Sequence, residues 1–505
     1  MATQDPKLHF VLFPMMAQGH MIPMMDTAKL LAHHENVMVT IVTTPKNASR
    51  FTSFVARYVE SGLHIQLIKL EFPCKEFGLP EGCENLDMLP GLALASNFFN
   101  VSKLLQHEVE KLFQELTPPA TCIISDMFLP YTIHIAKKFN IPRIAFTAVS
   151  CFWLYNMHNL HVSNIMEIMA NKESEYFDLP GIPDKIEMTL AQTGLGSTKA
   201  MEALKQFNED MLEADMGSYG IITNSFEELE PTYARDYKKI RNDKLWCIGP
   251  VSFSNIDDLD KVQRGNSNKV LVDEWKHLKW LNSHKDESVI YACLGSLCNL
   301  TSLQLIELGL ALEATKRPFI WVLREGNQLE VLKKWLEESG FEGRINGRGL
   351  VIKGWAPQLL ILSHPAIGGF LTHCGWNSTI EAICAGVPMV TWPLFADQFF
   401  NECLVVQILN VGVKIGVKSP MQWGEEEKSG VLVKKEDVER GIEVLMDETC
   451  ECKERRKRIR ELAEMAKKAV EKGGSSHSNV ALFIQDIMKI KDSDKNHMKK
   501  HVLYV

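Results

Sequence analysis

Short β-branched runs alternate with amphipathic stretches through the first half of this chain, and this alternation constrains the fold more than any other feature. His9–Pro14 and Val37–Thr43 have the pattern of strands, and Met25–His33 between them has helical apolar spacing. Strands joined by helices form βαβ units, which build parallel sheets. Further strand-like runs are Leu63–Leu70, Thr121–Ser125, Arg143–Phe146 and Gly220–Thr223. One doubly wound α/β domain is therefore expected.

The same pattern restarts after a polar stretch at residues 255–268, which has the composition of a surface linker. The strand-like runs that follow are Val289–Leu294, Phe319–Leu323, Leu350–Ile352, Ile367–Thr372 and Met389–Trp392. Since single cores stop growing near about 250–300 residues, a chain of 505 residues favours two domains. We expect an N-terminal Rossmann-like domain over 1–250, a linker over 251–270 and a second Rossmann-like domain over 271–475. The C-terminal helix and tail, 476–505, can pack back on the first domain.

Charge and hydropathy exclude several kinds of partner. The formal charge of −8 is spread along the chain without a basic stripe, which argues against nucleic acid. No apolar run is long enough to cross a membrane, and residues 1–7 lack the apolar stretch of a secretory signal. The 12 cysteines have no repeating spacing and are expected to be reduced thiols. We expect a cytoplasmic monomer that acts on small molecules.

A strand that turns into a helix is the densest chemical signal. Gly368–His373 is an apolar run that ends in polar residues, and Trp376-Asn377-Ser378 then begins a helix. Free backbone N–H groups at a helix N-terminus suit a diphosphate, to which Asn377 and Ser378 add side-chain donors. His373 can donate to a phosphate oxygen and help a leaving nucleotide to carry its charge, which makes a metal unnecessary.

Residues on either side of this turn suit the rest of a sugar nucleotide. Trp355 offers a flat face for a pyrimidine, and Glu381 offers two acceptor oxygens for ribose hydroxyls. Asp397 and Gln398 could bind the hydroxyls of the sugar. Each of these residues also has an ordinary structural explanation, because Trp and His often pack in Gly-rich segments and Asn-Ser often caps a helix.

A second constellation pairs His20, just after the first strand, with Asp126 at the end of the Thr121–Ser125 strand. A carboxylate on one imidazole nitrogen orients the ring and stabilises its cation, so the other nitrogen can remove a proton from an acceptor hydroxyl. A helix-capping histidine and a buried strand-end aspartate would explain the same residues without catalysis. The pattern alone favours this structural alternative.

The motif between Trp355 and Gln398 matches the plant secondary-product glycosyltransferase signature over its whole length. Its matching parts are Trp355-Ala-Pro-Gln358, His364, Gly368–His373, Gly375–Ser378, Glu381, Gly386–Pro388 and Asp397-Gln398. The chain resembles a plant UDP-dependent glycosyltransferase of family 1 from His9 through Ser478. The resemblance implies an α/β GT-B fold, in which two Rossmann-like doubly wound domains face each other across a cleft, and an inverting mechanism.

The resemblance also assigns roles to residues. It makes His20 the catalytic base and Asp126 its orienting acid, reversing the preference for a structural explanation. The UDP-sugar site that it implies comprises Gly19, Ser296, Trp355, Ala356, Gln358, His373, Cys374, Gly375, Trp376, Asn377, Ser378, Glu381, Asp397 and Gln398. The UDP-sugar is a co-substrate, and no cofactor or metal is expected. The implied reaction moves a sugar from its α-linked UDP donor to an acceptor hydroxyl and forms a β-glycoside.

The sequence says less about which donor and acceptor are used. Gln398 is found in relatives that prefer glucose, while UDP-glucuronate, UDP-galactose and other UDP-sugars remain alternatives. The chain looks most like the subgroup that glycosylates triterpenoids, flavonoids, steroids and small phenols, of which we favour a triterpenoid or flavonoid hydroxyl. Candidates for an apolar acceptor wall are Met16, Phe128, Phe152, Trp153 and Trp392, although such residues are more often core.

Two other classes of function fit less well. A nucleotide-binding regulator that had lost catalysis would be expected to lack His20 and Asp126, which are both present. An NAD-dependent oxidoreductase needs a Gly-x-Gly-x-x-Gly turn after its first strand, and residues 14–19 do not supply one.

Overall fold

A seven-stranded parallel sheet forms the first domain in the computed structural model, which describes residues 8–169, 172, 174–195, 204–265, 271–298, 300–324, 330–421 and 426–502. The strand order is β3-β2-β1-β4-β5-β8-β9. The strands are β1 (Leu8–Phe13), β2 (Val37–Thr43), β3 (Ile65–Lys69), β4 (Cys122–Asp126), β5 (Arg143–Thr147), β8 (Gly220–Thr223) and β9 (Leu245–Cys247). A separate antiparallel hairpin joins β6 (Tyr176–Asp178) and β7 (Glu187–Thr189).

Helices connect the strands of this domain. They are α1 (Gln18–Ala32), α2 (Pro45–Ser49), α3 (Thr52–Glu60), α4 (Ala95–Glu115), α5 (Thr132–Phe139), α6 (Cys151–Val162), α7 (Ile165–Met169), α9 (Lys205–Met216) and α10 (Pro231–Ile240), with short 3₁₀ turns at Cys74–Phe77, Leu86–Met88, Leu92–Leu94 and Val251–Ser254. Every residue of β1, β4, β5 and β8 is buried. Burial on both faces explains why these strands are nearly continuous apolar runs in the sequence.

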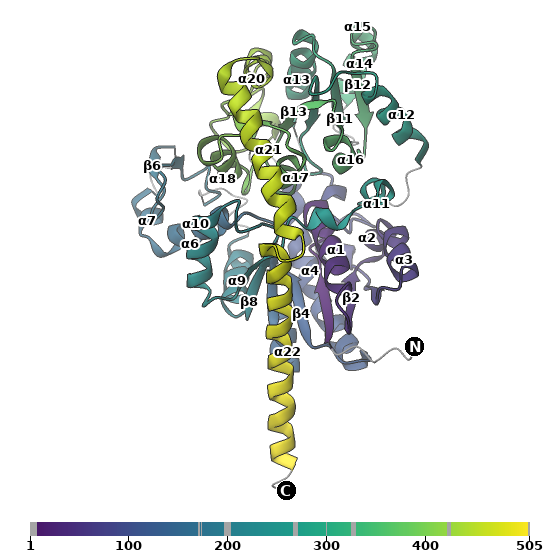
Figure 1. Cartoon of the computed structure of the whole chain (residues 1–505), viewed down its shortest axis with the longest axis vertical. Coiled ribbons are helices and arrows are strands. Elements are labelled where there is room, and N and C mark those ends of the chain that lie inside the picture. Colours follow the sequence, from purple (N-terminus) through teal and green to yellow (C-terminus); the bar gives the residue numbers. More distant parts are fainter. Residues whose placement is uncertain are drawn as a thin grey trace.

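The second domain repeats this architecture with a six-stranded parallel sheet in the order β12-β11-β10-β13-β14-β15. Its strands are β10 (Val289–Cys293), β11 (Phe319–Leu323), β12 (Gly349–Lys353), β13 (Ile367–Thr372), β14 (Met389–Thr391) and β15 (Gly412–Lys414). Its helices are α12 (Leu271–Leu281), α13 (Ser302–Ala314), α14 (Glu330–Glu338), α15 (Phe341–Arg344), α16 (Gln358–Leu362), α17 (Trp376–Ala385), α18 (Gln398–Cys403), α19 (Glu426–Ser429) and α20 (Lys435–Met446), with a π-helical turn at Leu404–Ile408. The expected pair of doubly wound domains is confirmed (Figure 1).

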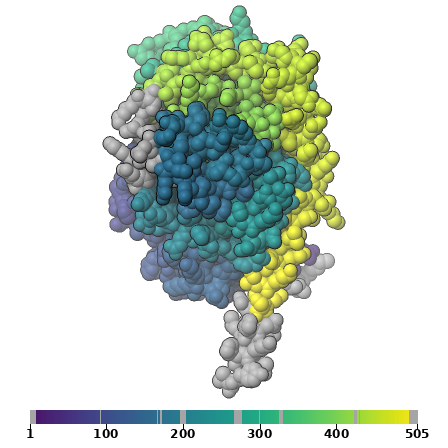
Figure 2. All heavy atoms as spheres, turned by 90° about the vertical axis from the view of Figure 1, so that its left-hand side faces the viewer, coloured from purple at the N-terminus to yellow at the C-terminus, as the bar shows by residue number. Residues whose placement is uncertain are grey.

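Two C-terminal helices link the domains along one side of the molecule. They are α21 (Cys450–Val470) and α22 (Ser475–Val502), and Gly473 and Gly474 lie between them. Figure 2 shows this yellow segment descending from the second domain over the first. The ring of Phe483 in α22 lies 5.5 Å from Phe10 and 5.2 Å from Trp246, measured between centroids. The start of α22 therefore closes one face of the first sheet.

The expectation of an exposed linker after residue 250 is wrong for its central part. Asp258–Gln263 form the short helix α11, and the side chains of Asp260 and Arg264 are only 6% and 7% exposed. The polar composition suggested that this segment is exposed to solvent. Its polar groups instead pair with opposite charges on both domains and can be buried for that reason. The segment is a packed seam between the domains.

We expect Phe483→Ala to destabilise the protein because it removes an aromatic ring that is fully buried between α22 and the first sheet. The loss should be about 3–5 kcal/mol, the usual range for a buried Phe. Thermal unfolding followed by circular dichroism measures it. Leu482→Ala on the same helix is the matched control, since Leu482 is 52% exposed and should change stability by less than about 0.5 kcal/mol. Equal effects of the two substitutions would show that α22 is not anchored through Phe483.

Candidate active site

A cleft of about 2520 Å³ opens between the carboxyl ends of the two parallel sheets. The loops after β1 and β4 reach it from the first domain, and the loops after β10 and β13 reach it from the second. Ligands of open α/β folds bind at this edge because successive crossovers leave a crevice there. Pockets for one small ligand usually occupy about 300–1,000 Å³, so this cleft has room for two molecules.

His20 and Asp126 meet at the floor of the cleft, as their strand-end positions predicted. The Nδ1 atom of His20, in the first turn of α1, lies 2.8 Å from Oδ2 of Asp126, the last residue of β4. The backbone N–H of Phe128 donates to Oδ1 of Asp126 at 3.0 Å. The side chain of Asp126 is fully buried, whereas that of His20 is 24% exposed. A carboxylate at Nδ1 selects the tautomer in which Nε2 carries the free lone pair.

The charge around His20 favours its protonated form. Burial by itself lowers the pKa of His20, but the charge of Asp126, the hydrogen bond to it and the charge of Asp397 together raise the pKa above the usual 6.5. An imidazole with a raised pKa is a stronger base and holds an abstracted proton more firmly. The pair can therefore remove a proton from a hydroxyl that enters the cleft.

The first turns of α1 and α17 touch across the cleft. The Asn377 side-chain amide donates to the Gly19 carbonyl oxygen. Asn224 supports this contact, since its amide donates to Oδ1 of Asn377 at 3.1 Å and its carbonyl accepts from the Trp376 indole at 2.7 Å. Asn224 was not expected at the site, although it directly follows the parallel strand β8, as a polar residue at a strand end singled out Asp126. These bonds hold the helix of His20 against the N-terminus of α17.

His373 lies at the end of β13, between two glycines. A Cβ atom on either Gly295 or Gly375 would approach Nε2 of His373 to 2.5 Å, so a side chain at either position would displace the imidazole. Burial lowers the pKa of His373 to about 4. The ring is therefore neutral at physiological pH and can contribute an N–H donor to an anion, but not a full positive charge.

The residues expected to hold a nucleoside gather beside α17. Trp355 lines the cleft, and Gln358 donates through Nε2 to Glu381 at 2.8 Å and to the Ser378 hydroxyl at 3.1 Å. Arg264 from the interdomain seam also donates to Glu381. Arg264 was not expected at the site because it lies in a stretch whose composition is that of a solvated linker.

Asp397 and Gln398 line the cleft at the start of α18. Burial raises the pKa of Asp397 to about 6, while its hydrogen bond from Asn401 at 2.7 Å opposes the rise. The side-chain oxygen of Gln398 accepts from the backbone N–H groups of Leu394 and Phe395 at 2.7 and 3.1 Å. These bonds fix both side chains at the cleft wall, where carboxylate and amide groups can bind hydroxyls.

Aromatic rings form the wall on the acceptor side of His20. The ring of Phe128 meets His20 edge-on, with 5.3 Å between centroids. Phe99 and Phe207 stack at 4.3 Å, and Phe128 lies 6.1 and 6.4 Å from them. All three phenylalanines line the cleft, as does Trp153. Phe128 and Trp153 were expected there, while Phe99 and Phe207 were not singled out because nothing in a helical apolar stripe separates a cleft wall from core.

Three of the residues that were expected to line the acceptor site lie in the hydrophobic core instead. Met16 and Trp392 are each 2% exposed, and Phe152 is fully buried against Tyr233 and Phe400. Their side chains belong to the hydrophobic core, which is where large apolar residues pack most favourably. The Cys374 side chain is also fully buried, so this expected donor-site residue can offer only its backbone.

The other expected donor-site residues line the cleft. They are Gly19, Ser296, Trp355, Ala356, Gln358, His373, Gly375, Trp376, Asn377, Ser378, Glu381, Asp397 and Gln398. Within the described part of the chain, no group of three or more His, Cys, Asp or Glu residues has an arrangement that could hold a metal ion. Among the described helices, none is long and apolar enough to cross a membrane.

Comparisons with known proteins identify the family. Residues 254–419 match the model of the UDP-glucoronosyl and UDP-glucosyl transferase family. UDP-glycosyltransferase 73C25 of Barbarea vulgaris is 54% identical over 490 residues, which cover 97% of this chain and 98% of that protein. The crystal structure of Glycyrrhiza uralensis UGT73P12 complexed with glycyrrhetinic acid 3-O-monoglucuronide has a TM-score of 0.87 and 35% identity, covering 98% of this chain and 99% of that one.

A second solved structure contains a UDP-sugar. Medicago truncatula UGT71G1 complexed with UDP-glucose has a TM-score of 0.77 and 25% identity, covering 97% of this chain and 100% of that one. These likenesses extend over both domains and the cleft between them, so they include every part of the candidate site. The chain belongs to the plant UDP-glycosyltransferases of family 1, GT-B enzymes that transfer a glycosyl group from a UDP-sugar.

Proposed function

We propose that this enzyme is an inverting O-glycosyltransferase that moves glucose from UDP-glucose to a hydroxyl of a triterpenoid or flavonoid. The observation that carries the proposal is the pair His20 and Asp126, in which a buried carboxylate fixes a half-buried imidazole at the cleft floor. The aromatic wall begins directly beside this imidazole, at Phe128. An acceptor seated on that wall brings its hydroxyl within reach of Nε2.

The proposed reaction is one displacement. Nε2 of His20 takes the hydroxyl proton as the acceptor oxygen forms a bond to the anomeric carbon. The bond from that carbon to the diphosphate oxygen breaks, and its electron pair leaves with UDP. Because attack and departure occur on opposite faces of the sugar, an α-linked donor gives a β-glycoside. Asp126 stabilises the imidazolium that forms, as the carboxylate of a catalytic triad does.

The leaving diphosphate is assigned to the N-terminus of α17. The first residues of this helix line the cleft, and Asn377, Ser378 and His373 add side-chain donors to its backbone N–H groups. A neutral His373 stabilises the developing charge through its dipole. We propose that the reaction needs neither a metal nor a cofactor, because these donors can take up the leaving charge.

The donor assignment rests on residues beside the diphosphate site. Trp355 is proposed to stack on uracil, Glu381 to accept the ribose hydroxyls, and Asp397 with Gln398 to bind glucose. The likeness to the UGT71G1 structure, which holds UDP-glucose, supports this donor. UDP-glucuronate and UDP-galactose are the alternatives to be compared with it.

The acceptor assignment rests on the aromatic wall and on the size of the cleft. Phe99, Phe128 and Phe207 present ring surfaces that suit a broad lipophilic molecule. The related UGT73P12 was solved with glycyrrhetinic acid 3-O-monoglucuronide, which supports a triterpenoid. Steroids and small phenols are alternative acceptors. We propose that the enzyme acts as a cytoplasmic monomer.

We expect His20→Ala to lower kcat by about 10²–10⁴, because the acceptor hydroxyl loses its general base. Product glycosides are measured by mass spectrometry with UDP-glucose, UDP-glucuronate or UDP-galactose and a panel of triterpenoid, flavonoid and phenolic acceptors, with and without chelator. His107→Ala, an exposed histidine on α4, is the control and should leave kcat unchanged. Activity of His20→Ala within tenfold of wild type would exclude His20 as the base, and loss of wild-type activity in chelator would exclude a metal-free reaction.

We expect Asp126→Asn to move the acid limb of the pH profile of kcat/KM to lower pH. The base must be neutral, so activity falls as pH drops through the pKa of His20, which Asp126 helps to raise. Removing this charge lowers that pKa and moves the midpoint downward, while the plateau rate also falls because the imidazolium is less stable. An unchanged midpoint would show that Asp126 does not act on the titrating group.

We expect His373→Ala to weaken UDP binding by roughly threefold to tenfold, the value of one neutral hydrogen bond. The pKa of His373 is about 4, so the imidazole is neutral at both pH 6 and pH 8. The ratio of the UDP dissociation constant of His373→Ala to that of wild type, measured by titration calorimetry, should therefore be the same at the two pH values. A ratio that grows as pH falls would mean that His373 binds the diphosphate as a cation.

A further inference from the structure

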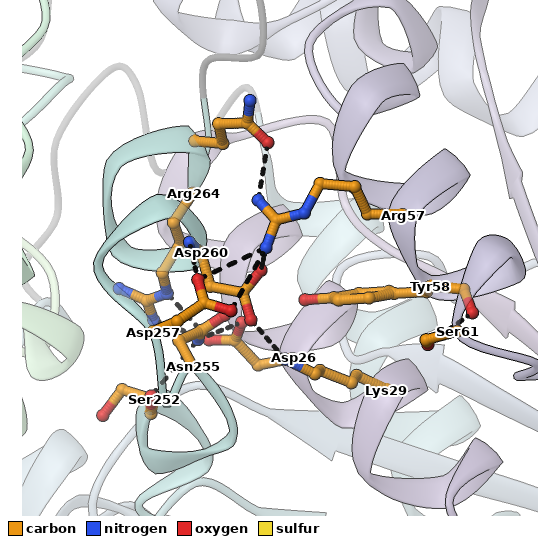
Figure 3. Close-up of polar contacts among 11 residues, drawn as sticks. Asp26, Lys29, Arg57, Tyr58, Ser61, Ser252, Asn255, Asp257, Asp260 and Arg264 are labelled. Carbon is orange, nitrogen blue, oxygen red and sulfur yellow. Dashed lines mark hydrogen bonds and ion pairs between the residues drawn. The ribbon is translucent and has the colours of Figure 1, made fainter. Parts of the chain in front are cut away.

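Arg264 joins two buried carboxylates that belong to different domains. Its Nε atom donates to Oδ2 of Asp26 at 2.8 Å, and its Nη1 atom donates to Oε1 of Glu381. The side chains of Arg264, Asp26 and Glu381 are 7%, 0% and 4% exposed. Asn255 holds the far side of Asp26, donating to Oδ1 at 2.8 Å. Figure 3 shows Arg264, Asn255 and Asp26 converging at the seam.

An arginine suits this bridge for a geometric reason. Its planar guanidinium directs N–H groups along two fixed directions, one toward α1 and the other toward α17. Burying either carboxylate without a partner would be costly, so the guanidinium compensates both charges at once. The bridge therefore fixes Glu381 relative to the first domain as well as to its own helix.

Glu381 is held at both of its oxygens. Arg264 donates to Oε1, and Gln358 donates to Oε2 at 2.8 Å. Each carboxylate oxygen has two acceptor positions, so each keeps one for a ligand in the cleft that Glu381 lines. A carboxylate whose plane is already fixed loses little freedom when it binds a pair of hydroxyls.

The residue after Arg264 closes on the neighbouring part of the same subsite. Gly265 has a φ of +86°, and a Cβ atom there would lie 2.7 Å from the Trp355 ring and from Ile22. The backbone thus lies directly on the edge of the indole. One short stretch of the seam contacts both Glu381 and Trp355, the two residues assigned to ribose and uracil.

We propose that Arg264 is a positioning residue for the ribose subsite. It acts through Glu381, whose carboxylate it orients toward the vicinal hydroxyls of the nucleotide, and it ties that carboxylate to α1, the helix that carries His20 in its first turn. The inference rests on the proposed ribose contact of Glu381, but not on the identity of the sugar or the acceptor. It assigns to the interdomain seam a part in recognising the donor.

A second buried cluster in the same seam provides the structural comparison. Asp260 accepts from Lys29 at 2.7 Å and from Arg57, and both partners belong to the first domain. Its side chain is 6% exposed, which is close to the value for Arg264. Figure 3 shows the two clusters side by side. Disturbing Asp260 loosens the seam without removing a hydrogen bond to Glu381.

The experiment compares UDP with 2′-deoxy-UDP by titration calorimetry, so neither chemistry nor acceptor enters. We expect wild type to bind UDP at least about tenfold more tightly than 2′-deoxy-UDP, because the analogue leaves a buried acceptor unpaired. In Arg264→Met this preference should fall below about threefold, through weaker UDP binding and little change for the analogue. Asp260→Asn should keep the wild-type preference for UDP, even if its melting temperature falls as far as that of Arg264→Met.

Three results would overturn the proposal. Equal weakening of UDP and 2′-deoxy-UDP in Arg264→Met would mean that Arg264 only stabilises the seam. Loss of the preference for UDP in Asp260→Asn would mean that any loosening of the seam abolishes this preference. Equal binding of UDP and 2′-deoxy-UDP by wild type would contradict the proposed ribose contact of Glu381. It would not contradict the proposed glycosyl transfer. If Arg264→Met does not fold, Arg264→Lys replaces it, and its preference should fall at least threefold because an ammonium cannot serve both carboxylates along fixed directions.

Discussion

A polar contact between α1 and α17 joins the two domains at the cleft. Each helix follows a strand of its own sheet, and each begins at the carboxyl edge that faces the other domain. Asn377 bonds to the backbone beside His20, and Arg264 bonds Glu381 to Asp26 farther along the two helices. Because these bonds are directional and those of Arg264 are also buried, they fix the base, the diphosphate site and the nucleoside site in one frame.

Two histidines in this frame have opposite electrostatic surroundings. Asp126 and Asp397 raise the pKa of His20 against the effect of burial, whereas His373 lies between glycines and its pKa falls. A raised pKa suits a group that must accept a proton, and a neutral imidazole suits a group that only donates a hydrogen bond. Two histidines can thus take different roles, one as the base and the other as a hydrogen-bond donor, because carboxylates lie beside only one of the two rings.

Much of the fold was predictable because local patterns coincide with local structure. The strands Phe319–Leu323 and Ile367–Thr372 have the bounds that their apolar patterns indicated. The edge strands β9 and β15 were not predicted, and each has only three residues. The seam around Arg264 was missed for a different reason, since its charges are buried only because partners on both domains neutralise them.

The amino-acid sequence by itself determined the two βα repeats, the strand-to-helix turn at His373 and the strand-end positions of His20 and Asp126, because hydrophobic period and turn residues act over a few positions. Only the tertiary structure decided which aromatic side chains face the cleft. Phe128 and Trp153 do so, whereas Phe152 and Trp392 pack in the core, although all four are large and apolar. It also decided that Glu381 meets Arg264, because these side chains come together only when two domains dock and exclude water from the charges between them.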